Sequence, residues 1–107
     1  MQPTKRIQYD LLSEEEMDDA LVQTMKAQQM DHYLHTVNAE RYEAMLPALE
    51  EGPWKDRVAG LLEETRGRIV EVESIIVALE PQMPDATRKA AAVARLTAAE
   101  AAAKARG

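Results

Sequence analysis

Apolar residues follow a helical spacing through most of the chain. Between residues 53 and 79 they recur at alternating intervals of four and three residues, which places them on one face of an α-helix. The positions are Val58, Leu62, Thr65, Ile69, Val72, Ile76 and Leu79. This unbroken series of heptads, rich in β-branched residues, predicts a helix that packs along a partner helix as in a coiled coil.

A second long helix is predicted between residues 14 and 46, because this stretch contains neither glycine nor proline. Ser13 and Glu16 have the spacing of a capping box, which marks a helix start. Two apolar stripes run along this helix on nearly opposite sides. The first contains Met17, Leu21, Met25, Gln28, His32, His35, Ala39, Tyr42, Leu46 and Leu49, and the second contains Ala27, Met30, Leu34, Val37, Ala44 and Met45. A helix in a two-helix pair buries only one stripe, so the second predicts contact with a third helix or a neighbouring molecule.

Prolines mark the helix boundaries. Pro53 suits the first position of a helix, and Pro81 and Pro84 end the same helix. Asp85 is then expected to cap a third helix that reaches Arg106. Alanine dominates this third segment, which favours a helix but buries little apolar surface, so we expect it to project or to dock lightly.

Residues 1–12 are expected to form an extended arm. Ile7, Tyr9 and Leu11 alternate with polar residues, which is the period of a strand. No second strand-like run follows, so the arm is expected to lie across the helices or to dock on another subunit; a frayed terminus is the alternative.

The predicted fold class is therefore all-α. It is a long antiparallel helical hairpin, similar to a coiled coil, with an extended N-terminal arm and an Ala-rich C-terminal helix. The hairpin occupies residues 13–80, with helices at about 14–46 and 53–79, and residues 81–107 form a Pro-rich hinge and the Ala-rich helix.

Composition narrows the range of functions. The chain of 107 residues is 46% hydrophobic, contains no cysteine and has a formal net charge of −6. Disulfides, zinc–thiolate sites and thiol nucleophiles are thereby excluded. The acidic balance predicts no direct contact with nucleic acid. Neither a signal peptide nor a membrane span is expected, so synthesis in the cytoplasm is the default.

Two histidines carry the only metal-ligand pattern. His32 and His35 share one helix face and are the sole metal candidates, but the Glu-x-x-His pattern of di-iron bundles is absent. We expect neither a metal nor a cofactor. Gln28, His32 and His35 instead interrupt an apolar stripe, where polar residues set register and oligomeric state. Assembly would then respond to pH near the ordinary histidine pKa of ~6.5.

Other features favour binding over catalysis. No nucleophile elbow, phosphate-binding glycine loop or paired carboxylate site is present, so no enzymatic activity is expected. The acidic run Glu14–Asp19 is expected to be a solvated helix start, or alternatively a patch for a basic partner. Trp54 follows the turn and is expected to close the hairpin end against Leu46 or Leu49, or otherwise to anchor an interface.

These expectations point to a non-catalytic helical structural or assembly protein. Its partners would be further copies of itself, other subunits of a larger assembly, or both. The interface residues we expect are Ile7, Tyr9, Leu11, Met30, Leu34, Val37 and Trp54. Small, cysteine-free helical proteins with terminal arms are typical of virus and phage particles, including head, connector and tail accessory components, so incorporation into such a particle is one expectation.

Two alternatives stay open at this point. The first is a small acidic inhibitor or regulator that binds a basic host protein through its acidic first helix. The second is a metal-binding helical bundle assembled from several chains.

Overall fold

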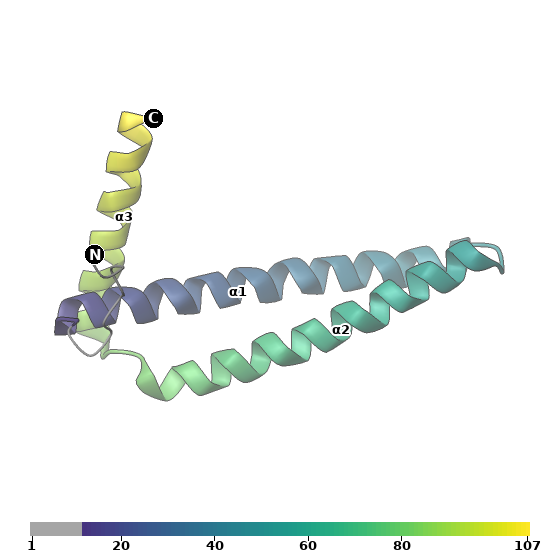
Figure 1. Ribbon diagram of the computed structural model, residues 1–107, viewed down its shortest axis with the longest axis horizontal. Helices are drawn as coiled ribbons and strands as arrows, with labels where there is room; N and C mark the ends of the chain where they lie inside the picture. The colour runs from purple at the N-terminus through teal and green to yellow at the C-terminus, as the bar shows by residue number, and fades with distance from the viewer. Residues whose placement is uncertain (1–11) are drawn as a thin grey trace, which may run out of the picture. The chain divides into compact units, whose positions relative to one another are not determined.

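The computed structural model describes residues 12–107 and contains three α-helices, α1 (Glu14–Met45), α2 (Pro53–Leu79) and α3 (Ala86–Arg106) (Figure 1). Short 3-10 segments follow the first two helices, at Leu46–Ala48 and Glu80–Gln82. The described residues contain no strand, so the predicted all-α class is confirmed. The predicted arm with Ile7, Tyr9 and Leu11 lies outside the described residues and stays a prediction.

Side chains cap two of the helices. At the start of α1 the amide of Glu16 donates to Ser13 Oγ at 3.1 Å, and the amide of Ser13 donates to Glu16 Oε1 at 3.2 Å. Asp85 caps α3 by accepting a bond from the Arg88 amide at 2.9 Å. The capping box and the aspartate cap predicted from the sequence are therefore both confirmed.

The described chain divides into two compact units. Residues Thr24–Gln82 form one unit, which we call the helix pair. The described residues up to Gln23 combine with Met83–Gly107 in the other, which we call the terminal unit. Helix α1 runs through the boundary between them, so it contributes to both units.

In the helix pair, α1 and α2 lie side by side and run in opposite directions (Figure 1). His32 of α1 bonds Glu73 of α2 at 3.2 Å, and Glu43, later in α1, accepts from Arg66, earlier in α2, at 2.6 Å. The order of the partners is thus reversed along the two helices.

One stripe of each helix supplies the packing of the helix pair. Every position of the predicted heptad series on α2 is buried or half-buried, and Val58, Leu62 and Val72 are among the least exposed residues of the chain. Met25 and Ala39 are the buried residues of the first α1 stripe in this unit. Removing a valine or leucine side chain from water contributes roughly 1.5–3 kcal/mol, so this stripe is the main source of stability here.

Two glycines of the helix pair differ in whether an alanine could replace them without strain. Gly52, in the turn before α2, has φ +152°, a backbone conformation that L side chains rarely adopt. Gly67 lies inside α2, and a Cβ atom built there would meet nothing within 4 Å.

Alanine at these glycines is expected to act in opposite directions. Gly67→Ala removes the entropic cost of a helical glycine, so it should raise the free energy of unfolding by about 1 kcal/mol. Gly52→Ala should lower it, because the alanine Cβ is strained at this φ. Urea denaturation of the dilute chain, followed by circular dichroism, measures both changes. A loss of stability in both variants would contradict the space found around Gly67.

Candidate interaction surfaces

The terminal unit is held by arginine–carboxylate pairs between the start of α1 and the first half of α3. Arg88 donates two bonds to the Asp18 carboxylate, from Nε at 2.9 Å and from Nη2 at 2.6 Å. The Arg88 Nε also lies 3.2 Å from Glu14 Oε1. Asp18 is only 3% exposed, and the two-pronged geometry satisfies both of its oxygens.

A second arginine repeats this arrangement two turns further along α3. Arg95 donates to the Asp19 carboxylate from Nη2 at 2.7 Å and from Nε at 3.0 Å, and it reaches the Glu15 carbonyl at 3.4 Å. Ala92 lies between the two arginines in sequence and is fully buried. Its small side chain permits a close approach, so α3 docks through charge and a small contact rather than through large apolar groups.

The pKa values of these groups change in the direction that favours the charged pairs. Hydrogen bonds from Arg88 lower the pKa of Asp18 below its ordinary value of 3.8, although burial offsets part of this effect. The bond to Asp18 raises the pKa of Arg88, and the bond to Asp19 raises that of Arg95. All three groups therefore stay charged at neutral pH.

The acidic run at the start of α1 is thus more than a solvated first turn. The glutamates Glu14, Glu15 and Glu16 are exposed, as expected of a solvated first turn. Asp18 departs from that expectation because it is buried and has a basic partner in the same chain. Sequence reasoning missed these residues. The available signal was the seven-residue spacing of Arg88 and Arg95 around Ala92, which puts all three on one face of α3.

Asp18→Asn is expected to weaken the docking of α3 in a pH-dependent way. Because folding lowers the pKa of Asp18, the stabilisation is complete above pH 3.8 and is lost as the pH falls through the lowered value. Amide hydrogen exchange of α3 should differ between wild type and variant at neutral pH, and the difference should shrink below pH 3.8. Asp31→Asn, at an exposed site of the helix pair, is the matched control. Identical pH profiles for both variants would refute the role of Asp18.

The predicted polar positions of α1 lie at intermediate exposure in the helix pair. Gln28, His32 and His35 are each half-buried. His32 is the one with an identified partner across the pair, Glu73, while its carbonyl accepts a bond from Thr36 at 2.8 Å. Among the described residues, no group of three or more histidine, cysteine or acidic side chains is placed to hold a metal ion.

The His32–Glu73 pair is expected to contribute little to stability. Its two side chains are 37% and 57% exposed, so solvent screens their attraction. A double-mutant cycle with His32→Ala and Glu73→Gln at pH 6 should give a coupling free energy below about 1 kcal/mol. A coupling of several kcal/mol would instead indicate that the pair is a principal structural element.

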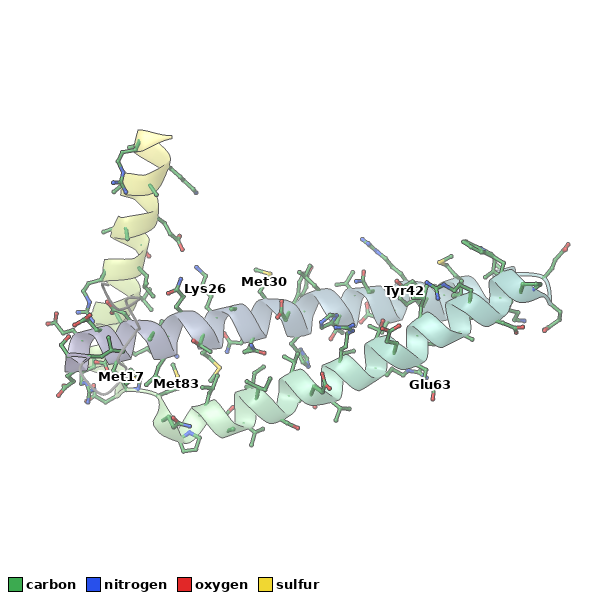
Figure 2. The ribbon with its side chains drawn as sticks, in the orientation of Figure 1. Met17, Lys26, Met30, Tyr42, Glu63 and Met83 are labelled. Carbon is green, nitrogen blue, oxygen red and sulfur yellow. The ribbon has the colours of Figure 1, made fainter. Side chains whose placement is uncertain are left out.

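A line of residues on α1 remains accessible to a partner. Met30, Leu34, Val37 and Arg41 follow intervals of four and three along the side away from α2, and we call them the α1 face. Met30 and Leu34 are 53% and 50% exposed, Arg41 is exposed and Val37 is half-buried. Figure 2 shows Met30 projecting away from α2. Three of the expected interface residues thus lie together on one face.

A corresponding line runs along the outer side of α2, and the sequence reasoning missed it. Glu63, Val70, Ser74 and Val77 are exposed, and we call them the α2 face. Val70 and Val77 are 64% and 65% exposed. The missed signal was a second set of heptad spacings, in which positions 63, 70 and 77 repeat every seven residues.

Trp54 is on the surface of the helix pair. It is 66% exposed, so the expectation that it closes the end of the two helices was wrong. Trp54 follows Pro53 at the start of α2, and its indole is largely exposed to solvent. Its expected role as an interface anchor stays a prediction.

Comparison with known proteins adds no further residues to these surfaces. The chain matches no protein-family model, no curated protein and no solved structure. None of the helices in the described part of the chain combines the length and apolarity needed to cross a membrane.

Proposed function

We propose that this chain is a non-catalytic helical assembly protein that acts through protein–protein contacts, in the first place with further copies of itself. The helix pair is its central module, an antiparallel hairpin similar to a coiled coil. The extended arm and the Ala-rich helix α3 provide additional contacts to neighbouring subunits.

The exposed α1 face is the observation that carries this proposal. Met30 and Leu34 each expose about half of their surface, on the side opposite the packed stripe. Contiguous exposed apolar groups of this kind mark sites of association, because water is unfavourable for them. A chain with so few fully buried large side chains also gains stability from a partner that covers this face.

Polar residues between the two helices supply the specificity that an assembly module needs. An all-apolar stripe permits several registers, whereas half-buried polar groups favour the register in which each finds a partner. The bond between His32 and Glu73 ties one level of α1 to one level of α2. Because this pair is exposed and weak, it favours that register without fixing it alone.

Particles built from many copies of small helical chains are the setting we propose for this module. Virus and phage heads, connectors and tail accessory components use such subunits. The contacts would be with further copies and with other protein subunits, and the acidic helix pair disfavours direct contact with nucleic acid.

The internal ion pairs bear on the alternative of an acidic inhibitor. Glu14, Asp18 and Asp19 already have arginine partners within the terminal unit. A basic host protein would have to displace α3 to reach them. A partner that binds the exposed α1 face or α2 face would not have to displace another helix of the chain, and this supports assembly as the stronger proposal.

Replacing Met30 and Leu34 together tests the proposed function. The variant Met30→Gln, Leu34→Gln should lose self-association by a factor of ten or more, on the order expected from removing two apolar side chains from an interface. Light scattering after size-exclusion chromatography measures the mass across a concentration series. Asn38→Gln, at an exposed position of α1 outside the α1 face, is the control and should keep the wild-type mass. Unchanged association in the double variant would contradict the proposal.

A further inference from the structure

The α1 face and the α2 face lie on opposite sides of the helix pair. Figure 2 shows Met30 of the α1 face and Glu63 of the α2 face pointing outward on opposite sides of the two helices. Each face belongs to a different helix; the α1 face contains three apolar residues and the α2 face contains two, Val70 and Val77. A neighbouring helix laid along the pair therefore covers one face and leaves the other open.

The apolar parts of the two faces lie at the same level along the pair. The His32–Glu73 bond marks this level, since His32 lies between Met30 and Leu34, and Glu73 lies between Val70 and Val77. No axial shift is needed to bring the apolar part of one face against that of the other.

The charged residues of the two faces are of opposite sign but lie at different levels. The Glu43–Arg66 pair joins the helices nearer the turn. Arg41 lies two residues from Glu43 on the side away from the turn, whereas Glu63 lies three residues from Arg66 on the side toward the turn, because the two helices are antiparallel. Arg41 and Glu63 therefore have opposite charges and an axial offset of about five residues, or roughly 7.5 Å. In two helix pairs laid side by side in the same orientation, the long side chains of Arg41 and Glu63 would have to span this offset to meet.

The α2 face is also suited to close contact. Ser74 stands between Val70 and Val77, and its hydroxyl already donates to the Val70 carbonyl at 3.1 Å. This serine therefore requires no hydrogen bond from a partner, and its small size leaves room between the two valines for a larger side chain.

A symmetric contact between two α1 faces covers less of the exposed apolar surface. It would leave Val70 and Val77 of the α2 face in solvent in both copies, whereas a contact between an α1 face and an α2 face covers one face of each kind.

We infer that copies of this chain associate head to tail, with the α1 face of one helix pair seated on the α2 face of the next. This inference rests on the proposed assembly function and specifies its geometry. The contact is heterologous, so successive copies form a ring where the rotation closes and an open filament where it does not.

Two single substitutions test the geometry by complementation. Leu34→Glu blocks the α1 face, and Val70→Glu blocks the α2 face. In a head-to-tail assembly each contact needs one face of each kind, so each variant alone should be monomeric. An equimolar mixture should form a heterodimer of twice the 11.9 kDa chain mass and nothing larger, because the intact α1 face of one variant meets the intact α2 face of the other.

Sedimentation velocity of the wild type, the two variants and their mixture distinguishes a head-to-tail contact from other modes of self-association and from a monomer. If Val70→Glu keeps the wild-type mass, the contact is not head to tail and the inference is overturned, while the proposed assembly function stands. A mixture that stays monomeric beside an oligomeric wild type overturns it as well. A monomeric wild type contradicts both proposals. Circular dichroism checks that the variants remain helical, and Asn38→Glu supplies the same charge at an exposed position of α1 outside the α1 face as a control.

A charge exchange provides an independent measurement. Arg41→Glu and Glu63→Arg should each weaken association, by up to about fivefold for an exposed pair. The double variant should recover the wild-type affinity, since the two charges are exchanged across the same contact. Failure of the double variant to recover, with both single variants weakened, would place Arg41 and Glu63 in different contacts and contradict the inferred register.

Discussion

Contact with a single neighbouring helix covers only part of a helix's circumference, and this limit governs the helix pair. Helices α1 and α2 each bury one stripe of side chains, and Val58 and Leu62 of the α2 stripe are nearly inaccessible to water. The apolar side chains on their outer sides have no such partner within the pair. A second copy would remove them from water without any change in the packing between α1 and α2.

The terminal unit is held together by charged hydrogen bonds instead of by a stripe of large apolar side chains. Helix α3 has few large apolar side chains, so burial alone gives little reason for it to dock. Arg88 and Arg95 supply the attraction through paired bonds to carboxylates, and the buried Ala92 allows the helices to come close. Lysine at these positions would offer a single point charge in place of the two-pronged geometry. Salt and acid therefore act on the terminal unit far more than on the helix pair.

Local sequence patterns predicted the all-α class, two helix caps and the stripe of α2 that is buried or half-buried. They succeed because the heptad spacing and the caps at Ser13 and Asp85 depend on neighbours within a few residues. They failed for Asp18 because its partner is 70 residues away, and a run of acidic residues looks the same whether or not arginines meet it. They failed for Trp54 because proximity to a turn does not determine which side of the helix an indole occupies.

The terminal unit is made of two segments that are far apart along the chain. Its ion pairs join residues separated by 70 and 76 positions, whereas those across the helix pair join residues separated by 41 and 23. During synthesis from the N-terminus, the helix pair can close as soon as α2 emerges. Asp18 and Asp19 gain their arginine partners only after α3 has been synthesised. Completion of the terminal unit therefore follows closure of the helix pair, and the order of translation separates the formation of the two units in time.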